Sequence, residues 1–516
     1  MPYDYRPFDY TPPPGLTGPE PRHKVVIVGA GPIGLAMALE LANHGVASVL
    51  LDDNNVVSSG SRAICWSKRS LEIFARLGIA DKALAKGVTW KVGRIFHRDQ
   101  EVFNFDLLPE EGHQMPAFIN LQQYYVEEFM VQAAQENPLI DLRFKNKLVG
   151  LCQSDHATID IETPDGPYQI EADYVLACDG AGSAIRGVMG LDFDGELFEE
   201  RFLIADIEMQ ADFPSERRFW FEPTFHPGQS ALLHKQPDNI YRIDLQLGWD
   251  ADPEIEKRPE NVIPRIQRVV GHSDFRLDWV SVYTFQCRRL GRFVEGPVIF
   301  VGDSAHIVSP FGARGGNGGL QDVDNLGWKL AAVLSGKAGT ELLQSYDRER
   351  VFACQENILN SARATKFMTP DDGAERIFRD AVLHLAATAP FARSWVNSGR
   401  LSRPCVYPCA GPDHPGLPRT SCPGSVAPDA PTDKGWLNAA LAGQVTLLAI
   451  GQPAPKVPGL RTLTITPNDF VTSRYLGAAG QALYLVRPDQ VIAARWIAAA
   501  PQAIADAVTA IWKGQT

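Results

Sequence analysis

The sequence predicts an α/β protein in which a parallel sheet with covering helices is interrupted by a mixed β-sheet and followed by a smaller α/β domain. Residues 24–28 form a short apolar strand that runs directly into a glycine-rich turn and a helical stretch. Within residues 202–286, five stretches alternate polar and apolar side chains, as half-buried strands do. The segment 402–430 is rich in proline, glycine and cysteine and precedes a last set of strands.

Length and charge restrict the class of protein. The chain has 516 residues, and domains of roughly 150 residues are usual, so we expect several. The net charge of −12 argues against nucleic acid or an anionic membrane as a partner. No run of about 18 apolar residues occurs, so we expect no membrane-spanning helix. The eight cysteines include no Cys-x-x-Cys pair and no zinc spacing; we expect reduced thiols, no metal site and a cytoplasmic protein.

The first glycine turn is typical of a dinucleotide-binding unit. Strand 24–28 is followed by the pattern Gly29-x-Gly31-x-x-Gly34, a helix over 35–44 and a second strand, 47–51, that ends at Asp52. In this Rossmann-type unit, the glycines permit a tight turn, approach of the backbone to a pyrophosphate and close helix packing, and the acid binds ribose hydroxyls. NAD and FAD both remain open from this element alone. The candidate contacts are Gly29, Gly31, Pro32, Ile33, Gly34, Asp52 and, with its side chain expected on the other side of the strand end, Asp53.

Two more predicted strands lead into an aspartate beside a glycine. Residues 173–177 lead into Asp179, and residues 298–301 lead into Asp303. A carboxylate at the C-terminal edge of a strand can bind a sugar or ribitol hydroxyl. Both aspartates are therefore predicted to contact the cofactor.

A glycine-rich run, 310–319, precedes a further helix over 320–334. Such a run places backbone N–H groups and the positive end of the helix dipole against an anion or an electron-rich ring. For a flavin, that anion would be the reduced isoalloxazine, which is charged near N1 and O2.

In this combination, residues 24–364 resemble the single-component FAD-dependent aromatic hydroxylases, the group of p-hydroxybenzoate hydroxylase and phenol hydroxylase. The resemblance implies FAD as cofactor and NAD(P)H as co-substrate. It implies that Asp179 serves both, that Asp303 binds the ribitol chain and that Pro310 lies beside the flavin C4a. The cofactor-binding positions implied in this way are Arg62, Gln123, Asp179, Gly180, Gly302, Asp303, Pro310, Gly312, Gly315, Gly316 and Asn317.

The resemblance also implies the reaction. NAD(P)H would reduce FAD, O2 would add at C4a, and the hydroperoxide would hydroxylate a phenol ortho or para to its hydroxyl. The identity of the phenol and the choice of NADH or NADPH stay open. The alternatives are an epoxidase or halogenase on the same fold and a flavin-binding protein without turnover. Against a halogenase, the motif Trp-x-Trp-x-Ile-Pro is absent around Trp220.

The alternating strands predict a substrate chamber. On residues 240–248, Arg242 and Gln246 share the polar face, and the resemblance turns such a face toward the flavin. A phenol reacts faster as phenolate, so we select His226 and Tyr283 to relay its proton. Arg242 could instead neutralise a substrate carboxylate. A solvated sheet face is the competing interpretation for each residue. The pocket candidates are His226, His234, Arg242, Gln246, Tyr283 and Phe311, and the catalytic candidates are Pro310, His226, Tyr283 and Arg242.

We expect the chain to divide into an arm, two large domains, a linker and a C-terminal domain. The C-terminal part resembles the thioredoxin-like domain of the phenol-hydroxylase branch. It lacks Cys-x-x-Cys, so it would be structural or a dimer contact, and we expect a homodimer. The expected parts are 1–23 (arm), 24–195 with 287–400 (Rossmann-type FAD-binding domain), 196–286 (inserted mixed β-sheet substrate domain), 401–430 (linker) and 431–516 (thioredoxin-like α/β domain).

Overall fold

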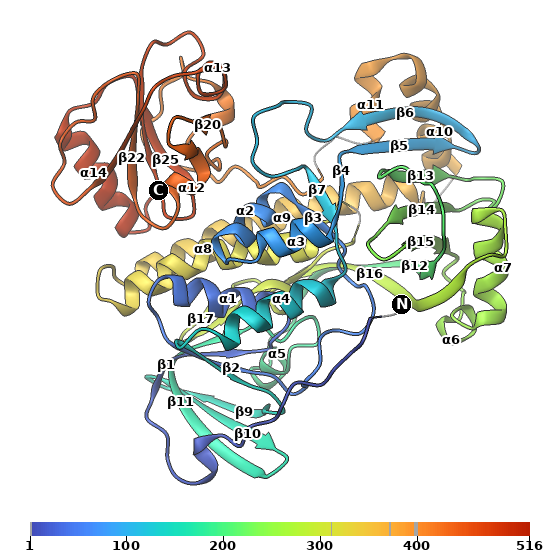
Figure 1. The fold of residues 1–516 in the computed structure, drawn as a ribbon, viewed down its shortest axis with the longest axis horizontal. Helices are drawn as coiled ribbons and strands as arrows, with labels where there is room; N and C mark the ends of the chain where they lie inside the picture. Colours follow the sequence, from blue (N-terminus) through green and yellow to red (C-terminus); the bar gives the residue numbers. More distant parts are fainter. Residues whose placement is uncertain (1–2, 311, 371–372, 397–400) are drawn as a thin grey trace.

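Two large sheets and a smaller C-terminal sheet form the protein. The computed structural model describes residues 3–310, 312–370, 373–396 and 401–516. In Figure 1, the second large sheet lies on the right and the C-terminal sheet at the upper left, with long helices between them. This arrangement confirms the predicted α/β fold with more than one sheet.

The first sheet is mainly parallel. β1 (His23–Val28) lies between β2 (Ser48–Leu51) and β11 (Gly166–Ala177), and both pairings are parallel. β8 (Ile140–Arg143) continues the sheet beside β2, and β18 (Val298–Phe300) continues it beside β11, again in parallel. The C-terminal ends of these strands therefore lie along one edge, where ligands bind in open α/β sheets. The remaining strands of this sheet are β9 (Lys147–Gln153), β10 (Ala157–Thr163) and β17 (Val294–Glu295).

Helices cover this sheet and bury its apolar strands. α1 (Pro32–Asn43) starts with a proline in its first turn, where a missing N–H costs nothing. It packs against α4 (Gln123–Gln135) and α8 (Gly315–Leu334), and residues on every side of α1 are buried. α8 packs in turn on α9 (Glu341–Met368), a helix that the sequence patterns did not predict.

The second sheet has eight strands, and two of them come from the N-terminal part of the chain. Its order is β19-β16-β12-β15-β14-β13-β5-β6. β5 pairs in parallel with β13, with Gly93 opposite Arg217. This long-range pairing carries residues 92–106, which lie within the range 24–195 expected for the FAD-binding domain, into the second sheet. The strands are β5 (Val92–His97), β6 (Gln100–Asp106), β12 (Asp194–Glu208), β13 (Arg217–Phe221), β14 (Ser230–Lys235), β15 (Ile240–Leu247), β16 (Arg276–Arg289) and β19 (His306–Ile307).

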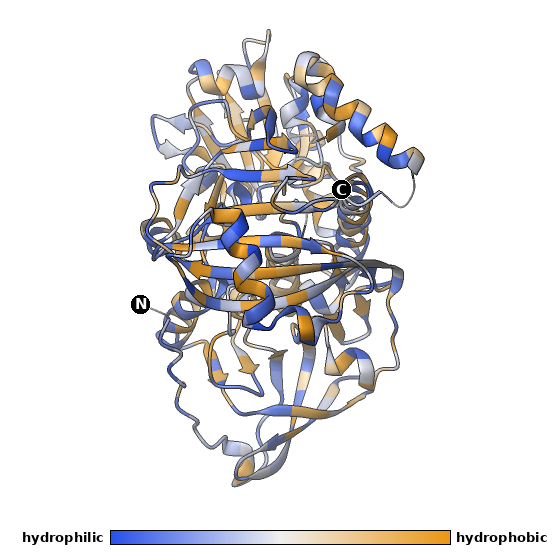
Figure 2. Ribbon diagram, turned by 90° about the vertical axis from the view of Figure 1, so that its right-hand side faces the viewer, coloured by the Kyte–Doolittle hydropathy of each residue, from blue (hydrophilic) through white to orange (hydrophobic). Residues whose placement is uncertain are grey.

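Alternation along β15 separates the two faces of this sheet, as predicted. Tyr241 and Ile243 pack with Val262 of α7 (Pro259–Val270), which crosses the strands in Figure 2. The even-numbered residues face the other way, and the Arg242 guanidinium donates to the carbonyl of Arg62 at 2.6 Å. The polar face of β15 is thus turned toward the loops of the first sheet.

The C-terminal unit is a four-stranded sheet with a helix. Its strand order is β23-β22-β24-β25, and only β22 and β23 are parallel. Arg487 holds the unit on α9 by donating to both carboxylate oxygens of Glu349, at 2.8 and 2.9 Å. The thioredoxin-like assignment stays a prediction. The elements are β22 (Thr446–Ile450), β23 (Arg461–Ile465), β24 (Ala482–Val486), β25 (Ile492–Trp496) and α14 (Pro501–Trp512).

The N-terminal arm lies along the surface of its own chain. The Tyr3 hydroxyl donates to a carboxylate oxygen of Glu128 at 2.9 Å, and the ring of Phe8 stacks on Phe144 with 4.8 Å between centroids. In the part of the chain described, no helix has the length and apolar character needed to cross a membrane. The remaining elements are η1 (Pro14–Leu16), β3 (Cys65–Ser67), α2 (Lys68–Arg76), α3 (Ala80–Lys86), β4 (Val88–Trp90), β7 (Phe118–Asn120), α5 (Ala184–Val188), α6 (Pro253–Glu256), η2 (Gly302–Ser304), α10 (Gly373–Thr388), α11 (Pro390–Val396), η3 (Arg419–Ser421), β20 (Pro431–Thr432), β21 (Gly435–Trp436), α12 (Leu437–Leu441), α13 (Asp469–Val471) and η4 (Thr472–Leu476).

Candidate functional site

The turn between β1 and α1 needs glycine at two positions. Gly29 has a φ of +102°, and a Cβ there would collide with the carbonyl of Cys178. A Cβ at Gly34 would overlap the carbonyl oxygen of Gly29, so this glycine lets α1 lie directly against the turn. Gly31, at the start of α1, faces open space, with no protein atom within 4 Å of a Cβ. The first N–H groups of α1 are therefore accessible to a pyrophosphate.

Asp52 lies beside this turn. Its carboxylate accepts from the backbone N–H of Ala30 at 2.6 Å and from that of Asn54 at 2.8 Å. Burial raises the pKa of the Asp52 carboxyl above its ordinary value. The neighbouring Asp53 is exposed. The geometry therefore favours Asp52 over Asp53 for the ribose hydroxyls.

Two unsatisfied carboxylates follow β11 and β18 at the same edge. Oδ2 of Asp179 accepts from the N–H of Ile185 at 3.1 Å, but its Oδ1 is buried without a hydrogen-bond partner among the described residues. The side chain of Asp303 is exposed on one side, while surrounding protein atoms desolvate it enough to raise its pKa. A buried acceptor without a donor is costly, so Asp179 fits a ligand that carries hydroxyl groups. The exposed carboxylate of Asp303 is accessible to the same kind of ligand.

Gln123 and Arg62 are the two predicted cofactor contacts at the loop that follows β2. The Gln123 amide donates to Ser58 at 3.1 Å and to Glu127 at 2.8 Å, and it accepts from the N–H of Ala63 at 3.2 Å. These bonds occupy the side chain of Gln123, so it fixes the loop rather than extending into the cofactor groove. The cofactor groove is the edge of the first sheet that carries the turn before α1, Asp52, Asp179 and Asp303. Arg62 has a φ of +39° and an exposed side chain, which leaves its guanidinium accessible to phosphate.

The glycine-rich run continues this groove and leads into α8. The Asn317 amide accepts from the N–H of Ser67 at 2.9 Å and donates to the carbonyl of Ala313 at 2.6 Å. Its side chain therefore holds the run in shape, and the N–H groups of Gly315 and Gly316 at the start of α8 are the available donors. Gly312 has a φ of +94°. The remaining positions of this groove predicted from the sequence are Pro32 and Ile33 in the first turn of α1, Gly180 after β11, Gly302 after β18 and the exposed Pro310.

The sequence-predicted substrate residues do not form one cluster. Arg242 donates to Asp244 at 2.8 Å as well as to the Arg62 carbonyl, so its guanidinium is already paired. His234 lies on the same side; burial keeps its pKa well below the ordinary value, and its Nδ1 lacks a partner among the described residues. Gln246 accepts from the N–H of Ser230 at 2.9 Å. These contacts make the polar face an internal network rather than an open wall.

The two residues selected for proton relay have different positions. The His226 Nε2 lies 2.7 Å from the carbonyl of Gln246, and burial lowers the pKa of this histidine. The cations that lower it further, Arg265 and Arg268, belong to α7 on the side of the sheet opposite Arg242. His226 therefore lies on the α7 side of the sheet, and its role in proton relay stays a prediction. Tyr283 is exposed and pairs across the sheet with Phe202 of β12, whose ring joins the apolar cluster on the groove side. Phe311 lies outside the described residues.

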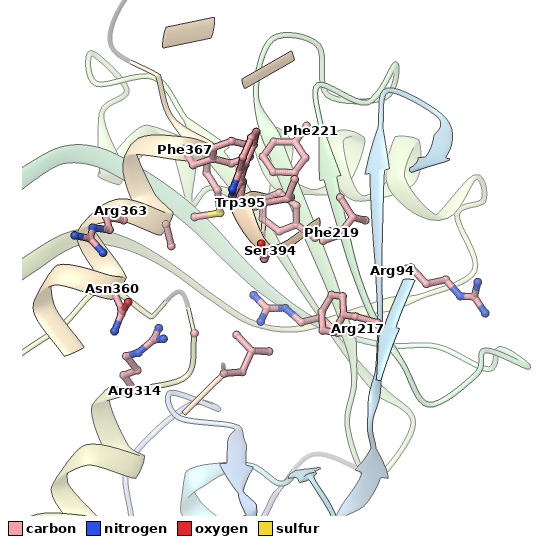
Figure 3. Close-up of a pocket in the computed structure, with 17 residues that line it drawn as sticks. Arg94, Arg217, Phe219, Phe221, Arg314, Asn360, Arg363, Phe367, Ser394 and Trp395 are labelled. Atoms are coloured by element: carbon pink, nitrogen blue, oxygen red, sulfur yellow. The ribbon is translucent and has the colours of Figure 1, made fainter. Parts of the chain in front are cut away.

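A cavity of about 260 Å³ adjoins the groove at Gly312 and Arg314. β5, β6 and β13 form one wall, and α9 and α11 form the other (Figure 3). None of the pocket residues selected from the sequence and described in the structure lines it. The strand pattern over 217–221 contained the signal that was missed, since Arg217, Phe219 and Phe221 share the face that points inward. The aromatic lining consists of Phe105, Phe219, Phe221, Phe367 and Trp395.

Known proteins match both the sequence and the fold. The FAD binding domain family matches residues 22–361. A 12-dehydrotetracycline 5-monooxygenase/anhydrotetracycline 6-monooxygenase of Streptomyces rimosus is 28% identical over 523 residues, which is 95% of this chain and 97% of that protein. A 3-(3-hydroxy-phenyl)propionate/3-hydroxycinnamic acid hydroxylase of Mycolicibacterium smegmatis is 28% identical over 72% of this chain, which spans 66% of that protein, just under two thirds. The flavin-dependent monooxygenase PieE, solved in complex with FAD and substrate, has the same fold, with a TM-score of 0.80 at 22% identity over 95% of this chain and 100% of that one.

Proposed function

The chain belongs to the FAD binding domain family, and from this membership we propose that it is an FAD-dependent monooxygenase that hydroxylates a phenolic aromatic compound. NAD(P)H is the proposed electron donor and O2 the oxygen source. The observation that carries the proposal is the cavity with aromatic walls that adjoins the cofactor groove at Gly312. The reaction class is supported by the matched relatives, which are named as a monooxygenase and a hydroxylase.

Different residues of the groove contact different parts of FAD. The N-terminus of α1 faces the pyrophosphate, Asp52 accepts from ribose hydroxyls, and Asp303 accepts from the ribitol chain. The start of α8 presents N–H groups and a positive dipole to the pyrimidine edge of the ring. Bound FAD supplies the two-electron carrier that passes reducing equivalents from NAD(P)H to O2. Asp179 has one free acceptor oxygen for the ribityl or nicotinamide side.

The second sheet and α9 handle the substrate. The rings of Phe219, Phe221 and Phe367 line the cavity, where they exclude water and pack on an aromatic substrate. His226 and Tyr283 stay the candidates for moving the phenolic proton, and Tyr283 is favoured because it pairs with Phe202 on the groove side of the sheet. Arg242 fixes the loop at Arg62 instead of binding a carboxylate.

A direct assay tests this function. The purified protein should show the absorption spectrum of bound FAD, and a phenolic compound should accelerate its oxidation of NAD(P)H. With ¹⁸O2, the product should carry one labelled oxygen ortho or para to the original hydroxyl. FAD binding without acceleration by any member of a phenol panel would contradict the proposal and favour a flavin-binding protein without turnover.

Two more proposals concern the oligomeric state and the cellular location of the protein. We propose a homodimer, on the resemblance of the C-terminal unit to a domain that forms dimer contacts. A cytoplasmic location is proposed because all eight cysteines are free in the structure. Sedimentation of the FAD-loaded protein measures the first, and a mass close to one chain of 56.7 kDa would rule the dimer out.

A further inference from the structure

The cavity beside Gly312 is positively charged within an acidic protein. The net charge of the chain is −12, yet four arginines line the cavity and no aspartate or glutamate does so among the described residues. Apolar side chains, five of them aromatic, make up most of the remaining wall. A site of this composition favours a ligand that is both aromatic and anionic. The four arginines are Arg94, Arg217, Arg314 and Arg363.

Two of these arginines are already paired within the protein. Arg94 donates to Glu216 at 2.7 Å and to Glu101 at 2.9 Å, and its guanidinium points away from the cavity in Figure 3. Arg314 is engaged within the protein, and its guanidinium lies against Gly312. Their charges are therefore committed to the fold or to the edge of the groove.

Arg217 is in a different situation. It lies on β13, and its guanidinium points across the cavity toward Arg314 and Asn360 (Figure 3). No hydrogen bond or ion pair joins its side chain to the described residues. Asp244 is the nearby acid that acts on its charge, but that carboxylate already accepts from Arg242 at 2.8 Å. The side chain of Arg217 is half-buried in the cavity wall, and this burial lowers the pKa of its guanidinium.

Partial removal of a cation from water without a counter-ion costs free energy. No hydrogen bond or ion pair within the described residues offsets this cost at Arg217. Arg363 adds a second cation: it is exposed on α9 at the rim of the same cavity, and no ion pair involves it among the described residues. Arginine presents its donors in a planar fork that matches the two oxygens of a carboxylate. In Figure 3, the guanidinium of Arg217 points toward Arg314, so the ring of a ligand paired with it extends toward the groove, while Phe221, Phe367 and Trp395 line the opposite part of the cavity.

We propose that Arg217 is the specificity-determining residue of the cavity and that it pairs with a carboxylate on the aromatic substrate. The substrates are then phenolic acids that point their carboxylate at β13 and the ring to be hydroxylated at Gly312. This inference rests on the proposed function for the identity of the ligand as a substrate. It replaces Arg242, which the sequence suggested for this task, by an arginine of the cavity wall that has no partner among the described residues.

Equilibrium binding to the FAD-loaded protein, without NAD(P)H, tests the inference. The probes are 3-(3-hydroxyphenyl)propionic acid and 6-hydroxy-2-naphthoic acid, each compared with its primary amide. Binding is followed by the change in flavin absorption. We expect each acid to bind at least about tenfold more tightly than its amide, the value of one charge-assisted pair. Equal affinity of acid and amide in both pairs would overturn the inference.

Three variants locate the effect. Arg217→Gln should abolish the preference for the acids and leave affinity for the amides unchanged, and Arg217→Lys should restore part of it through a single point charge. The matched control is Arg218→Gln on the same strand, where the side chain donates to Glu216 at 2.7 Å and does not line the cavity. Unchanged preference in Arg217→Gln, with FAD content and thermal stability as in the parent, would overturn the role of Arg217.

The two proposals fail separately. A preference for acids that depends on Arg217, but with no acid-stimulated oxidation of NAD(P)H, would contradict the monooxygenase function and leave the carboxylate site standing. Hydroxylation of acids and amides that bind with equal affinity would support the monooxygenase function and contradict the carboxylate site.

Discussion

At the scale of single residues, the site depends on carboxylates that the protein leaves without partners. Asp303 is exposed at the end of β18 and accepts no hydrogen bond from the described residues. Asp179 has one buried oxygen without a donor, whereas both oxygens of Asp52 accept backbone N–H groups. The free acceptors mark where cofactor hydroxyls fit. Asp52 shapes the turn, and each of its oxygens keeps a further lone pair for the ribose hydroxyls.

The proposed contact of Asp303 with FAD can be tested by an isosteric substitution. Asp303→Asn should weaken FAD binding about tenfold, because a charged acceptor for a ribitol hydroxyl becomes a neutral one. The unfolding temperature of the protein without FAD should stay the same, since the carboxylate makes no internal bond. FAD content after gel filtration measures the effect, with Asp155→Asn in an exposed loop as control. Full FAD content in the variant would exclude Asp303 from the cofactor site.

At the scale of elements, β1, its turn and α1 could be predicted because their signals are local. Sequence patterns also predicted strands over 217–221, 240–248, 444–450, 460–465, 481–486 and 491–496, each within about two residues of the observed ends. The missed features depend on distant partners. β5 joins the second sheet only through its pairing with β13, and Arg217 becomes notable only once α9 and α11 close the cavity around it. No local pattern contains that information.

Substitutions at two glycines of the first turn should affect thermal stability and FAD binding separately. Gly34→Ala should destabilise the protein without FAD, because its Cβ would overlap the carbonyl of Gly29 where α1 meets the turn. Gly31→Ala should leave that stability unchanged, because no protein atom lies within 4 Å of its Cβ, yet it should weaken FAD binding by filling space next to the pyrophosphate. Thermal unfolding of the FAD-free proteins and titration with FAD measure the two effects. Normal FAD affinity in Gly31→Ala would contradict the placement of the phosphates.

At the scale of the whole molecule, buried ion pairs join the C-terminal unit to the cofactor domain. Glu349 of α9 accepts from Arg487 through both oxygens and from Lys329 at 3.0 Å. Arg69 of α2 reaches the same unit by donating to the carbonyl of Asp489 at 2.7 Å. Removal of one partner would leave the other charge buried and unpaired at a low dielectric constant. The stability of this junction therefore depends on the ionisation of its members. The C-terminal unit is therefore held in a fixed position next to α8 and α9.

The ionisation of Glu349 predicts how this junction responds to acid. Its cationic neighbours lower its pKa from 4.5 to about 2 against the effect of burial. A carboxyl whose pKa is lowered by folding stabilises the fold fully above pH 4.5 and loses that contribution as the pH falls toward 2. Glu349→Gln should therefore cost up to about 3 kcal/mol at pH 7, with a smaller loss at pH 3. Urea unfolding at both pH values measures this, and the exposed Glu254→Gln is the control. An equal loss at pH 7 and pH 3 would show that packing at Glu349, rather than its charge, holds the C-terminal unit in place.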